Sequence, residues 1–139
     1  MRSPAILRLL AATLLVTLSG LAPAAPQNRV VFHLSEGDPS IWKQAFNNVR
    51  NVQKSFSKGN IAIAMVINGN AIGAAKLESP VAESLSEAIA SGIEIIACEN
   101  TMRERNLRRE DMHKNLVYTP VGTLDIMKKQ QEGWAYIKP

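Results

Sequence analysis

The chain has 139 residues, 46% of them hydrophobic and 20% charged, so it is too apolar to be disordered and too short for two full domains. Its net charge is +4, but without Arg2 and Arg8 of the N-terminal segment the 16 basic residues fall to 14 against 12 acidic ones, which gives no indication of nucleic-acid binding. One cysteine excludes an intramolecular disulfide, and two histidines 80 positions apart form no zinc-ligand pattern, so we expect no metal site.

The first 24 residues have the order of a secretory signal peptide. Two arginines precede a ten-residue apolar run over residues 9–18, and small residues follow from Ala22 to Ala25. A membrane-spanning helix needs roughly 20 apolar residues, and a Ser-Gly pair and a proline interrupt this run too early. We therefore expect cleavage between Ala24 and Ala25. The remaining chain, 25–139, is expected to be a single domain that works in the periplasm and has no membrane attachment.

The first half of this domain predicts two strands around one helix. A β-branched run over residues 29–34 predicts the first strand. Asp38 and Pro39 then provide a helix cap and a first helical residue. Apolar residues at helical spacing over 41–56 predict a helix that ends at the following Lys-Gly pair. The continuous apolar run 61–67 is typical of a strand buried on both faces.

The second half continues the alternation of strands and helices. Ser79-Pro80 predicts the start of a second helix, which Ser91-Gly92 closes. Residues 93–98 predict the third strand, and a capping-box pattern from Thr101 to Glu104 predicts a helix directly after the cysteine. Two short strands, 116–119 and 134–137, are predicted at the end, with a helix after Pro120 between them.

Four such alternations with apolar central strands predict an α/β fold in which helices cover both faces of a parallel sheet. In folds of this kind, sites form at the carboxyl ends of the strands. Three loops qualify, at residues 35–38, 68–73 and 98–101. The middle loop lacks the spacing of a dinucleotide-binding or phosphate-binding motif, so we interpret it as a strand-to-helix turn whose amides, at Asn68 and Gly69, line a site.

Two other groups of polar residues receive a structural interpretation. His33, within the first strand, is expected to be a hydrogen-bonding residue of the fold, and His113 is expected to be solvated. Neither has a visible triad partner, so nothing indicates a serine hydrolase. Four arginines between residues 103 and 109 alternate with acids, which indicates a solvated helix with intrahelical ion pairs. In the functional alternative, Arg103 or Arg105 raises the electrostatic potential near the cysteine.

Cys98 is the residue with the most informative position. A lone cysteine is usually a small buried apolar residue. An unpaired thiol in an exported protein is unusual, however, and this one is predicted at a strand end just before a helix, where backbone amides favour the thiolate. Because a second cysteine is absent, a C-x-x-C dithiol mechanism is excluded and a one-thiol mechanism remains.

Three segments resemble the DsrE/DsrF-like family: residues 92–102 around Cys98, residues 118–122 and residues 130–136. The resemblance extends from Arg29 to Lys138. It implies a three-layer α/β/α fold with a five-stranded, mainly parallel sheet, and assembly into homo-oligomers. It also implies a sulfur-relay activity, in which one cysteine at the end of the third strand carries sulfane sulfur as a persulfide. Cys98 stands at the matching position.

Two functions remain open at this stage. The first is a sulfurtransferase-like sulfur carrier that needs no cofactor; its Cys98 takes sulfur from protein or small-molecule donors and passes it to an acceptor thiol. Asn100 and Thr101, with the helix amides, stabilise the anion, and Arg103 and Arg105 add long-range attraction. The second is a non-catalytic oligomeric protein for binding or thiol sensing on the same scaffold. Alkylation of the native thiol discriminates between the two.

Overall fold

The computed structural model describes residues 25–57 and 59–139, and its core is one sheet of five parallel strands. The predicted signal peptide falls on residues 1–24, which lie outside the described residues. The strands lie side by side in the order β4-β3-β2-β1-β5. Their bounds are β1 Asn28–Leu34, β2 Ile61–Ile67, β3 Glu94–Cys98, β4 Val117–Thr119 and β5 Ala135–Ile137. All four strand pairs are parallel, which confirms the predicted α/β sheet.

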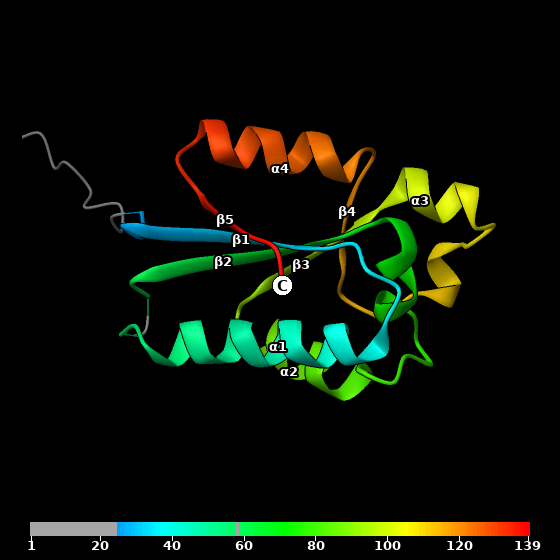
Figure 1. The fold of residues 1–139 in the computed structure, drawn as a ribbon, viewed down its shortest axis with the longest axis horizontal. Helices are drawn as coiled ribbons and strands as arrows, with labels where there is room; N and C mark the ends of the chain where they lie inside the picture. Colours follow the sequence, from blue (N-terminus) through cyan, green and yellow to red (C-terminus); the bar gives the residue numbers. More distant parts are fainter. Residues whose placement is uncertain (1–24, 58) are drawn as a thin grey trace, which may run out of the picture.

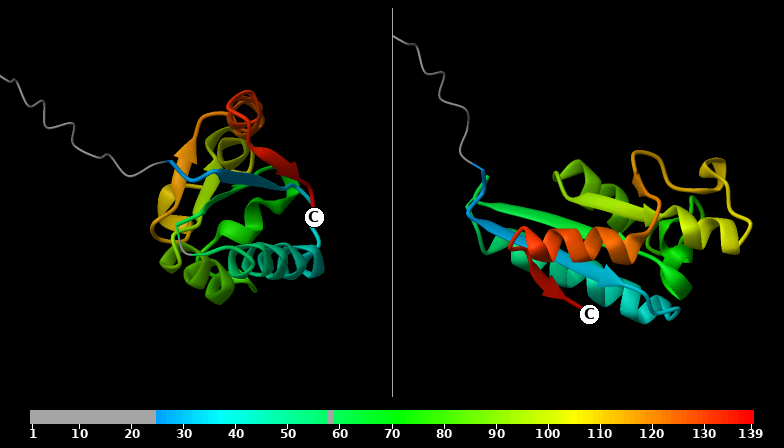
Figure 2. Two further views of the ribbon diagram at one scale, coloured as in Figure 1. Left: turned by 90° about the vertical axis from the view of Figure 1, so that its left-hand side faces the viewer. Right: turned by 90° about the horizontal axis from the view of Figure 1, so that it is seen from above.

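Helices cover both faces of the sheet and form three layers (Figure 1). Helix α1 (Pro39–Lys54) and helix α2 (Ala82–Ala90) lie on one face, and α4 (Gly122–Gln131) lies on the other. The left view of Figure 2 shows α4 above the sheet and α1 beside α2 below it. The short α3 (Glu99–Glu104) and two 3-10 helices, η1 (Gly69–Ala75) and η2 (Arg109–Asp111), occupy the connections. No helix among residues 25–57 and 59–139 is long and apolar enough to span a membrane.

The core is unequal on the two sides of the sheet, because successive side chains of a strand point to opposite faces. On the α1 and α2 side, one large buried cluster includes Phe32, Met65 and Ile95 from the three central strands. On the α4 side, the buried cluster has five residues: Val31, Ala64, Val66, Ile96 and Ile126. The central strands are thus buried on both faces, as the continuous apolar run in β2 predicts.

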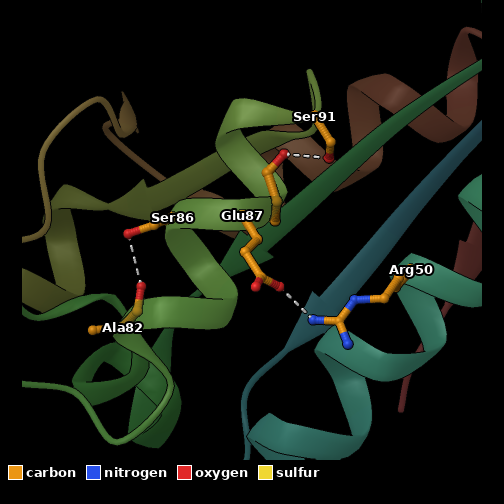
Figure 3. Close-up of polar contacts among 6 residues, drawn as sticks. Arg50, Ala82, Ser86, Glu87 and Ser91 are labelled. Atoms are coloured by element: carbon orange, nitrogen blue, oxygen red, sulfur yellow. Dashed lines mark hydrogen bonds and ion pairs between the residues drawn. The ribbon is translucent and has the colours of Figure 1, made fainter.

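Polar side chains make contacts between α1 and α2 and within α2 (Figure 3). Arg50 of α1 donates to Glu87 of α2 at 2.7 Å, and both side chains are largely exposed, so the pair adds little stability. The Ser91 hydroxyl donates to the Ala88 carbonyl at 2.8 Å in the last turn of α2. Gly92 follows with φ of +89°, a left-handed conformation that suits glycine and ends the helix where the sequence predicts.

Two predicted helix bounds and one predicted helix cap were wrong. Helix α1 ends at Lys54, before the predicted Lys-Gly pair, because the Ser55 amide already caps its last turn. Helix α2 begins at Ala82; the Ser79 hydroxyl accepts from the Val81 amide and stabilises the turn before the helix. The third helix begins at Glu99, directly after the cysteine as predicted, but Thr101 lies inside it and is not its cap. The capping box was therefore misassigned.

The predicted arginine-rich helix was also wrong. Helix α3 ends at Glu104, and Asn106 has φ of +53°, which breaks the helix before the remaining arginines. Arg109 pairs with Glu99 at 2.6 Å across this break, so the main ion pair is not intrahelical. His113 is partly exposed, and its ring hydrogen-bonds Ser86 at 2.8 Å and the Lys114 carbonyl at 2.8 Å.

Candidate functional site

The three predicted loops meet at the carboxyl edge of the sheet. The Asn68 amide donates to the Leu34 carbonyl at 3.1 Å, which ties the ends of β2 and β1 together. The Gly69 amide donates to the Thr101 hydroxyl oxygen at 3.1 Å and so joins η1 to α3. A fourth loop also takes part, since the Asn100 amide donates to the Pro120 carbonyl at 3.1 Å. This edge is therefore one hydrogen-bonded assembly.

Cys98 lies at the centre of this assembly. It is the last residue of β3 and immediately precedes α3, as the sequence predicts. Its side chain is buried, with 4% of the residue exposed. The amide of Gly122, at the start of α4, donates to the Cys98 sulfur at 3.3 Å. The thiol therefore lies between the N-terminal ends of two helices, of which the sequence indicated only the first.

Two opposing effects act on the pKa of Cys98. Burial is the largest single effect and raises the pKa of the thiol. Hydrogen bonds from the Thr101 hydroxyl, and from the amides of Thr101, Gly122 and Asn100, favour the thiolate and lower the pKa. The hydrogen bonds together outweigh burial, so the pKa of Cys98 lies below its ordinary value. This combination is suited to a stabilised sulfur anion in a protected site.

Gly122 has no room for a side chain. A Cβ atom there would lie 3.1 Å from Val66 Cγ1, 3.3 Å from Cys98 Cβ and 3.5 Å from Asn68 Cβ. The first two distances are tighter than ordinary packing contacts. The glycine thus lets the start of α4 approach the sulfur closely enough for its amide to donate.

The remaining predicted site residues divide into an inner and an outer group. Thr101 is buried and bridges Gly69 to the site. Asn100 is exposed, and its side chain exchanges hydrogen bonds with Arg103 at 2.8 Å and with Glu104 at 3.0 Å. Arg105 is exposed and donates to Asn70 at 2.6 Å, which links the far end of α3 to η1. The arginine side chains form the outer rim, and no contact joins either of them to the sulfur.

A polar row beside Cys98 was not predicted from the sequence. His33 of β1 hydrogen-bonds the Asn68 side-chain oxygen at 2.9 Å through Nε2 and the Tyr136 hydroxyl at 2.8 Å through Nδ1. Asn68 and Cys98 both lie against Gly122. The alternation of side chains along a strand could have predicted this row. His33, Asn68 and Cys98 each follow, by two positions, a residue of the buried cluster on the α4 side. Side chains related in this way share a face of the sheet.

Metal ligation is not part of this geometry. Within the part of the chain that the structure describes, no three His, Cys, Asp or Glu side chains lie close enough together to hold an ion. The groups around the sulfur are hydrogen-bond donors: backbone amides at two helix starts and one hydroxyl. The fold and site together define a small α/β protein with a single, anion-stabilised thiol at a strand end.

Comparison with known proteins identifies the family. The model of the DsrE/DsrF-like family matches residues 43–139, and the chain belongs to this family. The chain is similar to a solved protein of unknown function, MTH1491 from Methanobacterium thermoautotrophicum, with 30% sequence identity and a TM-score of 0.77. That similarity covers 81% of this chain and 99% of the other.

Two more distant structures share the fold alone. These are a conserved protein of unknown function, BT1422 from Bacteroides thetaiotaomicron, and the ychN protein from E. coli. Each is 11% identical to this chain with a TM-score of 0.61 and covers 81% of it; the similarity covers 95% of the first protein and 99% of the second. The search of curated proteins returned no significant match.

Proposed function

We propose that this protein is a sulfur carrier that holds sulfane sulfur as a persulfide on Cys98. The observation that carries the proposal is the convergence of hydrogen-bond donors on the Cys98 sulfur, which lowers the pKa of the thiol despite its burial. Membership of a family that suggests sulfur relay supports the same function. Because the donors surround the sulfur from two helix starts, they also suit the anion of a persulfide.

The transfer needs neither a metal nor a redox cofactor. The Cys98 thiolate attacks the outer sulfur of a donor persulfide, so a new S–S bond forms at Sγ. The donor's own S–S bond breaks at the same time, and the donor leaves as a thiolate. An acceptor thiolate then attacks the outer sulfur on Cys98 and regenerates the Cys98 thiolate. One sulfur atom moves in each step, and no electrons are exchanged with an external reagent.

Access to the sulfur requires the edge of the sheet to open, since Cys98 is only 4% exposed. The groups that cover it come from the starts of η1, α3 and α4, which hydrogen-bond one another. Opening of this kind involves short, hydrogen-bonded connections and not the central strands, so it costs less than global unfolding. A small anionic donor such as polysulfide needs the smallest opening.

We also propose that the protein is exported to the periplasm and assembles into homo-oligomers. Export follows from the signal-peptide pattern of residues 1–24. Assembly is supported by exposed apolar side chains at and beside the start of α4: Val117, Val121, Leu124 and Met127 are each 41–48% exposed. Large apolar residues gathered in this way are typical of protein–protein contacts. Donors and acceptors would be small sulfur compounds or thiol proteins of the same compartment.

One observation favours a second function. The burial of Cys98 also fits a packed or oxidation-sensing thiol in a non-catalytic binding protein. The alternatives predict different behaviour in native alkylation. A carrier thiol reacts below pH 8 with a midpoint below that of a free thiol, about 8.5. A packed thiol resists alkylation until the protein unfolds.

The experiment that tests the proposal measures the intact mass of residues 25–139 after exposure to polysulfide. We expect the mass of one added sulfur atom, removable by a thiol reductant, and no addition to the Cys98→Ser variant. A native protein that gains no sulfur, or a Cys98→Ser variant that gains as much, would contradict the carrier function.

A further inference from the structure

A row of polar side chains crosses the α4 side of the sheet and leads toward Cys98. Val31 and Ile96 belong to the buried cluster under α4, so His33 and Cys98, two positions further along their strands, face the same side. Asn68 follows Val66 of that cluster by two positions. The parallel register of β2 and β3 ends with Ile67 opposite Ala97, which sets Asn68 beside Cys98 on the next strand.

The hydrogen bonds of His33 define one orientation of Asn68. The Asn68 Oδ1 atom can only accept, so His33 Nε2 carries the proton and donates across 2.9 Å. In this tautomer His33 Nδ1 accepts from the Tyr136 hydroxyl at 2.8 Å. While Nε2 carries the proton, rotation of the Asn68 amide by 180° would set its NH₂ group against that proton, so that two donors face each other. His33 with its proton on Nε2 therefore holds the amide in the orientation that turns Oδ1 toward the ring.

This orientation turns the Asn68 Nδ2 group away from His33, on a side chain that shares the sheet face of Cys98. Nδ2 makes no hydrogen bond within the described part of the chain, residues 25–57 and 59–139. A Cβ atom on Gly122 would touch both side chains, at 3.5 Å from Asn68 Cβ and 3.3 Å from Cys98 Cβ. The donors that lower the pKa of the thiol itself come from Thr101, Gly122 and Asn100. Asn68 is a further side-chain donor on the sheet face that Cys98 shares.

We propose that His33 is a positioning residue that aims the Asn68 amide donor at the outer sulfur of a persulfide on Cys98. This inference rests on the proposed carrier function. The outer sulfur extends beyond Sγ, and it bears the negative charge once the persulfide forms. A hydrogen bond to an ionised group is stronger than one between neutral groups, so Asn68 stabilises the persulfide anion, whose charge lies on the outer sulfur. Tyr136 acts on Asn68 indirectly, because its hydroxyl hydrogen-bonds His33 Nδ1 and so influences which ring nitrogen carries the proton.

The equilibrium that reports this effect is sulfur exchange with a small persulfide. The Cys98 thiolate and the anionic donor persulfide give the Cys98 persulfide anion and the donor thiolate, so atoms and charge balance. Intact mass at a fixed ratio of glutathione persulfide to glutathione measures the exchange constant. The alkylation rate of sulfur-free Cys98 at the same pH is the second measurement, because it reports the thiol without the outer sulfur.

We expect His33→Phe to lower the exchange constant about threefold to tenfold, the range of one weakened hydrogen bond to a charged group. Its alkylation rate should stay within about twofold of the native rate, since Asn68 is not among the groups that stabilise the thiolate. His33→Gln, whose amide can still donate to Asn68, should keep most of the native exchange constant. His113→Gln, a change at the other half-buried histidine, is the matched control and should change neither quantity.

Several outcomes overturn the inference. His33→Phe with a native exchange constant, or with equal losses in exchange and alkylation, would show that His33 does not act on the outer sulfur. Asn68→Ala and the double variant His33→Phe/Asn68→Ala should share one exchange constant; a further loss in the double variant contradicts action through Asn68. If the native protein accepts no sulfur, the proposed function fails and this inference with it.

A second variant keeps the test decisive if His33→Phe does not fold. Asn68→Asp places a carboxylate where the amide donor stands, so it should lower the exchange constant below that of Asn68→Ala by charge repulsion. Equal constants for these two variants would show that residue 68 does not face the outer sulfur. Circular dichroism and thermal unfolding of each variant report whether the fold is retained.

Discussion

At the scale of single residues, Cys98 combines protection from solvent with stabilisation of its charge. Burial alone would produce an unreactive thiol with a raised pKa. The hydrogen bonds from Thr101, Gly122 and Asn100 reverse this direction. Thr101 contributes through both its hydroxyl and its amide and is itself held by the Gly69 amide. The chemistry of the sulfur therefore depends on a few residues that are not reactive themselves.

Thr101→Val tests this dependence. Valine keeps the shape of threonine and removes the hydroxyl, so we expect a higher pKa of Cys98 and slower alkylation at neutral pH. The Gly69 amide also loses its acceptor, which should lower the free energy of unfolding by about 1–3 kcal/mol. Rates of alkylation across pH and denaturant unfolding check the two effects. Thr123→Val, at an exposed position of α4, is the matched control, and an unchanged alkylation profile in Thr101→Val would contradict the account.

The pKa of Cys98 also predicts how stability varies with pH. A thiol whose pKa is lower in the folded chain binds more protons when unfolded, so the free energy of unfolding rises with pH between the two pKa values. The contribution is complete above the unfolded value, about 8.5, and is lost as the pH falls through the folded value. We expect the stability difference between the native protein and Cys98→Ser to increase over this interval. A difference that is constant or decreases would show that the pKa is not lowered.

The sequence predicted the position of the cysteine but not its partners. A strand end before a helix is visible in the residues around Cys98, because the apolar run and the polar residues after it are local. Thr101 was assigned to the helix cap, a local role, whereas its hydroxyl binds Gly69 from another loop. His33 and Tyr136 are 103 positions apart, and only the order of strands in the sheet brings them together.

At the scale of the elements, the N-terminal end of α4 completes the site. Its first residue, Gly122, donates to the sulfur, and the helix runs away from the thiol with its basic residues in the last turn. This orientation presents the partial positive end of the helix dipole to the thiolate. The start of α4 therefore stabilises the thiolate together with the start of α3.

Gly122→Ala should displace this helix from the thiol. The new methyl group would meet Val66 at 3.1 Å and Cys98 at 3.3 Å, so the start of α4 must move outward and its hydrogen bond to the sulfur must lengthen. We expect a higher midpoint pH for alkylation and a loss of stability of about 1–3 kcal/mol from overpacking. Thr123→Ala, one position further along α4, is the control. A native midpoint in Gly122→Ala would show that the amide of α4 does not stabilise the thiolate.

The arginines of α3 should contribute little. Arg103 and Arg105 are exposed and bond to Asn100 and Asn70, respectively, not to the sulfur. Exposed charges in water interact weakly and are screened by salt. Replacing both with glutamine should slow alkylation by less than about twofold, and high salt should abolish the difference. A larger, salt-independent loss would mean that these side chains act directly at the thiol.

At the scale of the whole molecule, the two faces of the sheet are covered unequally. Helices α1 and α2 pack on one face, and α4 packs on the other (Figure 2). The apolar side chains of Leu124 and Met127 are 41% and 48% exposed on α4. A second copy of the chain packed there would bury these side chains close to the start of α4, and would therefore also restrict access to the sulfur.

The double variant Leu124→Glu/Met127→Glu tests assembly. Like charges on an apolar contact oppose association, so we expect light scattering to show an oligomer for residues 25–139 and a monomer for the variant. Lys128→Glu, a change of charge at an exposed neighbouring position, is the control and should remain oligomeric. A native monomer at micromolar concentration would contradict the proposed assembly.

The fold was more predictable than the site. The buried run of β2 and the alternation of strands and helices are periodic signals that survive in a single sequence, and the observed parallel sheet follows from them. The arginine-rich segment misled the prediction, since a positive φ at Asn106 ends α3 without any glycine to announce it. The polar row from Tyr136 to Asn68 depends on the strand order, which periodicity does not reveal.

The most direct test of the carrier function is the mass of the intact protein after incubation with polysulfide and removal of excess reagent. Residues 25–139 should gain the mass of one sulfur atom, lose it on treatment with a thiol, and transfer it to that thiol in equal amount. The Cys98→Ser variant should gain nothing. A folded native protein that keeps its original mass, with Cys98 resistant to alkylation, would contradict the account and assign the thiol a structural role.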